Sequence, residues 1–375
     1  MTNKNLPPIR FFGKPHKKSG YGNAIINIAT AFSRSDVLTR FEIGSKKNLF
    51  EEELNNFKGR PKVDFFLQTP PFNRHKSNNY KIGYFYWETS TLPKIWAKDI
   101  SRSVNELWVP CELTKSACLK GGFRGPIEIL HTPCDTDISY SKVAIPSPMG
   151  NGLVLSENTF KFYSVFQWHE RKGYNELLRA YCKEFDEDDD VILILKVNPV
   201  KNNKSGIAKI KSDILKIKKM TNKTKLPKIY LIINHLSREE LIGLHKMCDA
   251  FVLPHRGEGW GMPIHDAMLC DSHIITTKFG GITELLSKDS AFIINHDIRP
   301  VKKMSWTPWY QSYQKWACPK LAHLRVLMRD VFDNNNKYRY KLEASKLLAS
   351  SLDISSCSLK IEKILSNKRF KKFLL

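Results

Sequence analysis

Residues 251–268 read Phe251-Val-Leu-Pro-His-Arg-Gly-Glu-Gly-Trp-Gly-Met-Pro-Ile-His-Asp-Ala-Met268, and this stretch decides the fold. An apolar run stops at Pro254, and a glycine-rich turn follows. Pro263 stands where we expect a helix to begin, because proline suits the first helical position. The amides at a helix start lack partners within the helix and attract anions such as phosphate. The pattern therefore predicts a strand, a phosphate-binding turn and a helix.

The composition of the turn points to a specific kind of ligand. Gly257, Gly259 and Gly261 let the backbone approach a bound molecule closely. Two carboxylates, Glu258 and Asp266, bracket the turn and suit hydroxyl groups. A phosphate-binding turn flanked by two acids indicates a site for a nucleotide sugar.

The composition of the whole chain is that of a globular protein. The 375 residues are 42% hydrophobic and 11% aromatic, which is enough for two domains with cores. The eight cysteines are scattered without Cys-x-x-Cys or zinc spacing, a pattern typical of reduced, cytoplasmic thiols. No signal peptide and no membrane span of about 18 apolar residues is evident. We expect a cytoplasmic protein (in the host cell if it is viral), with peripheral contact to a membrane or DNA left open.

The net charge of +23 is extreme for a metabolic enzyme. Lysines concentrate in residues 201–228 and in the tail at 367–372. Such a charge favours polyanions, whether nucleic acid, anionic lipid or acidic glycan. The alternative is that solvated helix faces simply carry lysine. The sequence leaves both interpretations open.

Strand-like and helix-like segments alternate along the chain, which predicts an α/β fold with parallel sheets. Residues 139–158 lose this periodicity and gain Pro, Ser, Gly and Asn, so they predict an interdomain linker. We therefore expect an N-terminal domain at 1–150 and a C-terminal domain at 151–354. The strands expected in the first are 8–13, 63–67, 81–86, 106–109 and 127–130, with a glycine turn at 19–23 before a helix at 24–32. Those expected in the second are 160–166, 191–196, 228–233, 250–253, 273–276 and 291–294.

The spacing of Glu258 and Asp266, with seven residues between them, resembles the signature of retaining glycosyltransferases of family 4. In that family two Glu flank a Glu-Gly-Phe-Gly-x-Pro core. Here Trp260 replaces the Phe, and the second acid is Asp, one methylene shorter. Further segments resemble the family in the same order, from about residue 20 to 290: the strand, Lys-Gly and helix unit at 166–180, the helix and strand at 237–254, the Gly-Gly-x-x-Glu loop at 280–284, and acceptor-side pieces at 87–88 and 108–110.

The resemblance implies the GT-B fold, with two Rossmann-like domains facing across a cleft and residues 355–375 returning to the N-terminal, acceptor-side domain. It also implies an enzyme that moves a hexosyl or pentosyl group from a nucleotide-diphosphate sugar to an acceptor hydroxyl, with retention. The acceptor would be a glycan, a lipid-linked molecule or another hydroxyl compound. No cofactor is expected, because the nucleotide sugar is a substrate.

The resemblance also implies roles for individual residues. Glu258 would contact the hydroxyls of the donor sugar, and Asp266 the ribose. The amides of Gly259, Trp260, Gly261 and Met262 would hold the diphosphate or sugar. Lys172 would neutralise the leaving diphosphate, since a fixed cation stabilises a departing phosphate. The family's usual Arg is Gln167 here, so Arg171 or His169 would compensate.

For the other candidate site residues, an ordinary structural role is an alternative to the functional role. Gly20 and Gly22 would approach the phosphate from the acceptor-side domain, or form an ordinary turn. Lys196, at a strand end, is a further phosphate candidate. Glu284 would face the nucleotide, and Glu88 would orient the acceptor hydroxyl or cap the following helix.

Two other functions remain open from the sequence. One is the same chemistry on hydroxylated DNA bases, as in viral DNA modification, which the charge would explain. The other is a non-catalytic GT-B module that binds nucleic acid or glycan through a basic face, for which Gln167 and Asp266 leave room.

The formal metal pattern at 188–190 precedes a strand, so we interpret it as solvated surface and predict no metal requirement.

Overall fold

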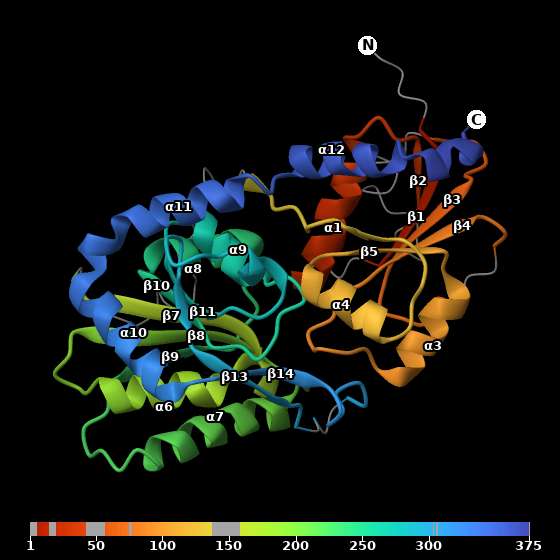
Figure 1. Cartoon of the computed structure of the whole chain (residues 1–375). Coiled ribbons are helices and arrows are strands. Elements are labelled where there is room, and N and C mark those ends of the chain that lie inside the picture. Colours follow the sequence, from red (N-terminus) through yellow and green to blue (C-terminus); the bar gives the residue numbers. More distant parts are fainter. Residues whose placement is uncertain are drawn as a thin grey trace. The chain divides into compact units, whose positions relative to one another are not determined.

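The computed structural model describes residues 6–14, 20–42, 57–74, 77–136, 158–302, 304 and 307–374. The chain divides into two compact units, Met1–Asp135 with Ser350–Leu375 (unit 1) and Thr136–Ala349 (unit 2). Each unit contains its own six-stranded sheet with helices packed against it (Figure 1). The predicted linker lies almost entirely outside the described residues, so the exact domain boundary remains a prediction.

The sheet of unit 1 is parallel and has the order β2-β1-β3-β4-β5-β6. The central strand β3 is buried at all five positions, because a parallel sheet is covered on both faces. Its first helix begins four residues earlier than predicted, so the expected glycine turn is the first helical turn. The elements are β1 (Ile9–Gly13), α1 (Gly20–Ser33), β2 (Thr39–Glu42), β3 (Val63–Leu67), β4 (Tyr80–Tyr84), α3 (Lys94–Ser103), β5 (Glu106–Val109), α4 (Glu112–Lys120) and β6 (Ile127–Ile129).

The C-terminal segment completes the core of unit 1, as the sequence predicts. Helix α12 (Ile354–Leu365) packs against α1, and its Ile361 is fully buried in the core cluster that contains Phe32. The Ser358 hydroxyl donates to the Ala31 carbonyl oxygen at 2.8 Å. Beyond it, η5 (Lys368–Phe373) carries Arg369, which donates to the buried carboxylate of Glu106 at 2.8 Å.

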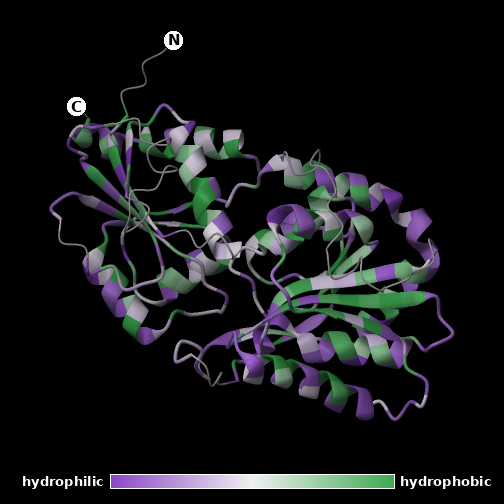
Figure 2. Cartoon of the chain, turned by 180° about the vertical axis from the view of Figure 1, so that it is seen from behind, coloured by the Kyte–Doolittle hydropathy of each residue, from purple (hydrophilic) through white to green (hydrophobic). Residues whose placement is uncertain are grey.

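The sheet of unit 2 is also parallel, with the order β12-β11-β10-β7-β8-β9. Its strands are largely apolar (Figure 2), as expected for strands buried on both faces. The elements are β7 (Phe160–Trp168), η2 (Glu170–Lys172), α6 (Tyr174–Glu184), β8 (Val191–Pro199), α7 (Lys204–Lys219), β9 (Lys228–Ile232), α8 (Arg238–Met247), β10 (Ala250–Leu253), α9 (Met262–Leu269), β11 (His273–Thr277), η3 (Gly281–Glu284), β12 (Phe292–Ile294), α10 (Leu321–Asn334), η4 (Asn335–Tyr338) and α11 (Arg339–Ser350).

The strand order of unit 2 reverses direction between β7 and β10. In open α/β sheets, connections that follow two such strands leave the sheet on opposite sides and form a crevice at the carboxyl ends of the strands. Open α/β sheets bind their ligands at this switch point. A separate antiparallel pair, β13 (His296–Pro300) and β14 (Lys315–Pro319), follows the sheet and was not predicted.

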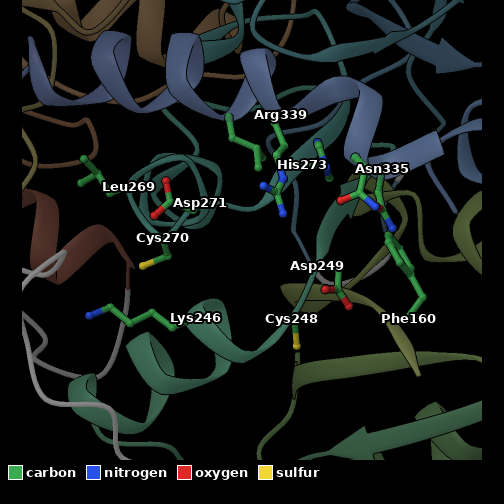
Figure 3. A pocket seen from close by; sticks show the side chains of 12 residues that line it. Phe160, Lys246, Cys248, Asp249, Leu269, Cys270, Asp271, His273, Asn335 and Arg339 are labelled. Carbon is green, nitrogen blue, oxygen red and sulfur yellow. The ribbon is translucent and has the colours of Figure 1, made fainter. Parts of the chain in front are cut away.

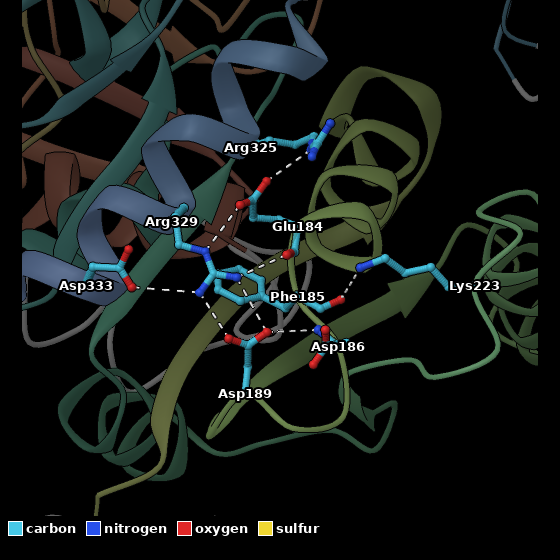
Figure 4. Close-up of polar contacts among 8 residues, drawn as sticks. All are labelled: Glu184, Phe185, Asp186, Asp189, Lys223, Arg325, Arg329 and Asp333. Carbon is cyan, nitrogen blue, oxygen red and sulfur yellow. Dashed lines mark hydrogen bonds and ion pairs between the residues drawn. The ribbon is translucent and has the colours of Figure 1, made fainter.

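Arg329 of α10 ties that helix to α6 and to the acidic loop before β8 (Figure 4). Its Nε donates to Glu184 at 3.2 Å, its Nη1 donates to Asp189 at 3.0 Å, and the guanidinium lies 4.4 Å from the centre of the Phe185 ring. Asp188 pairs with Lys225 at 3.5 Å and is largely exposed. Asp188 and Asp189 thus serve ion pairs, and Asp190 accepts a hydrogen bond from the Thr159 hydroxyl at 2.7 Å. No metal-binding cluster of His, Cys, Asp or Glu occurs among the described residues.

Candidate active site

Three loops meet at the carboxyl ends of β7, β10 and β11: η2 with Gly173, residues 254–261, and residues 279–284. Backbone hydrogen bonds join them. The Arg256 amide donates to the Arg171 carbonyl oxygen at 2.7 Å, and the Ile282 amide donates to that of Trp260 at 2.7 Å. The loop that resembles the family signature is therefore held from both sides.

Two glycines allow these loops to touch. Gly173 has φ of +69°, and a Cβ there would lie 1.9 Å from the Pro254 carbonyl oxygen. Gly281 has φ of +52°, and a Cβ there would lie 2.2 Å from the Trp260 carbonyl oxygen. A larger residue at either position would be strained by its backbone and would also push the neighbouring loop away.

Glu258 lies at the centre of the three loops with two cations. Its Oε1 accepts from Lys172 Nζ at 2.5 Å and from Arg171 Nη1 at 3.2 Å. Arg171 Nη1 also donates to the Gly257 carbonyl oxygen at 2.5 Å. All three side chains are about nine-tenths buried. The structure therefore brings together Glu258, Lys172 and Arg171, three of the four residues predicted to be catalytic.

Burial and neighbouring charges within this cluster decide which of its side chains are ionised. Burial alone would raise the pKa of Glu258, but the positive charges of Lys172 and Arg171 outweigh burial and hold it at about 2. Burial lowers the pKa of His255 to about 3, and burial beside the two cations lowers the pKa of His169 well below its usual range. Near neutral pH both imidazoles are uncharged, so His169 does not supply the cation that Gln167 lacks. The ionised groups leave one net positive charge.

The glycine turn ends in the first turn of α9. Gly261 is the N-cap residue, with φ of +97°, and the helix begins at Met262, so Pro263 occupies the second position instead of the predicted first. The first amides of a helix have no partner within it, and the helix dipole favours an anion there. Trp260 is buried, and its ring lies edge-on to the ring of His265, with 6.2 Å between the ring centres. This indicates a packing role for the Trp260 side chain.

Asp266 lies on α9 and is nearly fully buried. Its two oxygens accept from Arg238 Nη1 at 2.6 Å and Nη2 at 2.8 Å. Burial opposes ionisation, but Arg238 lowers the pKa of Asp266 below its usual value. Sequence reasoning missed Arg238. It follows Ser237, whose capping box with Glu240 is confirmed, yet no local spacing connects position 238 with position 266.

The other candidates of unit 2 lie on neighbouring elements. Lys196 on β8 is buried, its Nζ donates to Asn198 Oδ1 at 2.8 Å, and burial lowers its pKa to about 8. Glu284 is the last residue of η3, the turn whose backbone contacts Trp260, and it is partly exposed. Their predicted roles remain predictions.

The remaining candidates belong to unit 1. Gly20 and Gly22 lie in the first turn of α1, where Gly20 is exposed and Gly22 is buried. Glu88 lies after β4 and is partly exposed, and the preceding Trp87 donates its ring N–H to the Thr91 carbonyl oxygen at 2.8 Å. The roles predicted for these residues stay predictions.

A cavity of about 460 Å³ lies elsewhere in unit 2 (Figure 3). It is lined by Phe160, Asp249 and His273, which stand at or just before the first residues of β7, β10 and β11. It therefore opens at the amino ends of the strands, opposite the candidate site. Its acids already have partners, since Asp249 accepts from the Lys161 amide at 2.6 Å and Asp271 pairs with Lys346 at 2.8 Å.

Comparison with known proteins identifies the region around this site. Residues 151–299 match the family described as glycosyl transferases group 1, and they include all three loops. This part of the chain is therefore similar to the group 1 glycosyl transferases. Over 138 residues it is 24% identical to the serotype-specific mannosyltransferase WbdA of Escherichia coli, an alignment that covers 36% of this chain and 16% of WbdA. The chain thus matches only a small part of the length of these curated relatives.

Solved structures extend the likeness to both units. Anabaena HepE in complex with UDP and glucose has a TM-score of 0.64 at 14% identity, over 96% of this chain and 99% of that chain. Sucrose-phosphate synthase from Thermosynechococcus elongatus has a TM-score of 0.67 at 10% identity, over 96% and 98%. The predicted GT-B fold is confirmed. Within the described residues, no helix is both long and apolar enough to span a bilayer.

Proposed function

We propose that the protein is a retaining glycosyltransferase that moves a hexosyl or pentosyl group from a nucleotide-diphosphate sugar to an acceptor hydroxyl. The observation that carries the proposal is the buried cluster of Glu258, Lys172 and Arg171 beside the amino end of α9. Burying three charges is costly unless they serve one another or a ligand. One net positive charge next to a helix start suits a diphosphate.

In the proposed reaction, Lys172 and Arg171 stabilise the charge that gathers on the departing diphosphate. An ammonium group has three N–H donors, so Lys172 is able to hold Glu258 and a phosphate oxygen together. The amides of Gly261 and Met262 at the start of α9 add fixed dipoles that need no reorganisation during the reaction. Glu258 orients the donor sugar through its hydroxyls and positions both cations.

The transfer takes place on one face of the sugar. The bond between the anomeric carbon and the diphosphate oxygen breaks, and a bond from that carbon to the acceptor oxygen forms on the same face. The acceptor proton passes to an oxygen of the leaving diphosphate. Because its pKa is about 2, Glu258 is ionised throughout and does not act as the acid. No protein nucleophile is required.

The remaining candidates have supporting roles in this proposal. Asp266, oriented by Arg238, accepts from the ribose hydroxyls, and Glu284 and Lys196 border the nucleotide and its phosphates. Glu88 orients the acceptor hydroxyl, while Gly20 and Gly22 approach the phosphate. A hexose donor is favoured because the similar HepE was solved with UDP-glucose and WbdA is a mannosyltransferase. The eight cysteines form no disulfides, which supports the proposed cytoplasmic location.

The test is a panel of UDP, GDP and ADP sugars, with hydrolysis and transfer to simple glycosides followed by NMR of the anomeric proton. We expect transfer with retained configuration and its loss in Glu258→Gln. Glu343→Gln removes an exposed carboxylate on α11 and serves as the matched control. Transfer by Glu258→Gln at the parental rate would refute the site.

Two further arms address the other functions. Transfer only to DNA that contains hydroxymethylated bases would favour DNA modification, with the same catalytic residues. Failure to bind any nucleoside diphosphate or nucleotide sugar in a thermal-shift screen would favour a non-catalytic module, since a ligand of the folded state raises its stability.

A further inference from the structure

Helix α7 has two faces that differ in character. It lies beside α6 and β8 in unit 2, and the inward residues Ile210 and Ile217 are buried (Figure 1). On the outward face Leu215 is 60% exposed, and just beyond the helix Met220 is 56% exposed. Large apolar side chains in such positions lose the benefit of burial unless something covers them.

Lysines surround these two apolar side chains. Lys211, Lys216 and Lys219 line one shallow groove with Leu215 and Met220. Residues 201–228 include ten lysines and a single acid. That acid, Asp213, is mostly buried and accepts from the Trp168 ring N–H at 3.0 Å and from Lys209. No ion pair joins the three groove lysines to an acid anywhere in the described parts of the chain.

We propose that this outer face of α7, from Lys211 to Met220, docks on an anionic lipid bilayer. Lysine stems lie along apolar surface while their ammonium groups reach the lipid phosphates. Leu215 and Met220 are then able to enter the boundary between headgroups and acyl chains, as the apolar side chains of interfacial helices do. Purple and green alternate along this helix in Figure 2, which shows the same mixture.

The groove fits a bilayer better than a nucleic acid. Residues 201–228 contain no Phe, Tyr or Trp, so the surface offers no ring on which a base would stack. A phosphate backbone gives Leu215 and Met220 no apolar partner, whereas a lipid surface does. The interaction does not depend on the proposed sugar transfer, since α7 contributes none of the proposed catalytic residues.

Flotation of the full chain with vesicles tests the proposal. We expect binding to vesicles of 70% phosphatidylcholine and 30% phosphatidylglycerol in about 0.1 M salt, and little binding to pure phosphatidylcholine. Each lysine near an anionic surface contributes about fivefold to binding. The triple variant Lys211→Gln/Lys216→Gln/Lys219→Gln should therefore bind about 100-fold more weakly. Leu215→Asn/Met220→Gln should also weaken binding by at least tenfold, with the charge unchanged.

Matched controls keep the result specific. Lys183, Lys288 and Lys337 are exposed lysines of unit 2 outside the groove, so changing all three to Gln removes the same charge. This control and Glu258→Gln should float like the parent, and circular dichroism should show every variant folded. The proposal is overturned if the parent ignores anionic vesicles, if both triple variants weaken binding equally, or if the Leu215 and Met220 changes have no effect. The proposal is also overturned if the full chain binds DNA through the groove lysines but does not bind vesicles.

Discussion

The Nζ atom of Lys172 lies 2.5 Å from Oε1 of Glu258, and their side chains are 12% and 6% exposed. The two residues follow different strands, β7 and β10, which are neighbours only because the sheet reverses its order between them. Their contact makes the two charges depend on each other. The first two predictions follow from this dependence.

Replacing Lys172 by Met should lower both stability and transfer. The change leaves the Glu258 carboxylate buried with Arg171 alone, and losing one partner of a buried pair costs about 3 kcal/mol. Loss of a charge that stabilises the leaving group should reduce kcat by at least about 100-fold. Urea denaturation and transfer kinetics measure the two effects. The double variant Lys172→Met/Glu258→Gln should regain stability but not transfer, and recovery of transfer would contradict the assigned role.

The stability of the protein should depend on pH through Glu258. Its pKa in the folded protein is about 2, below the ordinary value of 4.5, so its charge stabilises the fold fully above pH 4.5. This contribution is lost as the pH falls from 4.5 toward 2. The difference in free energy of unfolding between the parent and Glu258→Gln should therefore be constant from pH 7 to 5 and shrink below 4.5. A constant difference down to pH 3 would show that the carboxylate is not held by its cations.

Binding of a nucleoside diphosphate should weaken in alkali because of Lys196. Burial lowers the pKa of this lysine to about 8, so it is charged below pH 8 and neutral above it. If Lys196 contacts a phosphate, the dissociation constant for UDP should rise between pH 7 and 9, as measured by calorimetry. Lys196→Met should bind UDP more weakly at pH 7 and show no such rise. An identical pH profile for the variant would remove Lys196 from the phosphate site.

Gly173→Ala should lower stability and transfer by more than the positive φ at this position alone explains. A positive φ costs a non-glycine residue about 1–2 kcal/mol, and here the new methyl would also strike the Pro254 carbonyl. We expect a loss of more than 2 kcal/mol and at least tenfold slower transfer, because the signature loop must move. Gly122→Ala is the matched control, since Gly122 has φ of +91° but open space around it. Equal losses in the two variants would mean that the loop contact is unimportant.

Arg238 should affect recognition of the ribose through Asp266. Replacing Arg238 by Met leaves the Asp266 carboxylate buried without its bidentate partner, so the pKa of Asp266 should rise and its orientation should be lost. UDP should then bind about tenfold more weakly, and the preference for UDP over 2′-deoxy-UDP should disappear. Competition binding with both nucleotides measures the preference. A variant that still prefers UDP would show that Asp266 does not contact the ribose.

Local patterns in the sequence predict much of this structure. The apolar run at 250–253, the glycines and Pro263 predict the strand, turn and helix start, and all three are present. The capping box at Ser237 predicts the start of α8. These features depend on residues a few positions apart, whose physical rules operate within one turn or strand.

Features that depend on distant residues were harder to predict. The pair of Arg238 and Asp266 joins two helices, and the sequence contains no pattern that specifies their contact. Strand β2 was missed because it has only four residues, too few for the alternation of apolar and charged positions to stand out. Helix α1 was predicted to start too late, because Gly20 and Gly22 favour a turn locally while packing of the helix on the sheet extends it.

The packing of α12 on α1 has a consequence for folding during synthesis of the chain. A ribosome releases the first 135 residues, then all of unit 2, and only then the segment from Ser350 onward that fills the core beside Phe32. Throughout that interval the nascent chain presents an uncovered apolar seam on α1, of the kind that holdase chaperones bind. Unit 1, most of which is translated first, thus completes its core only after unit 2 has been translated.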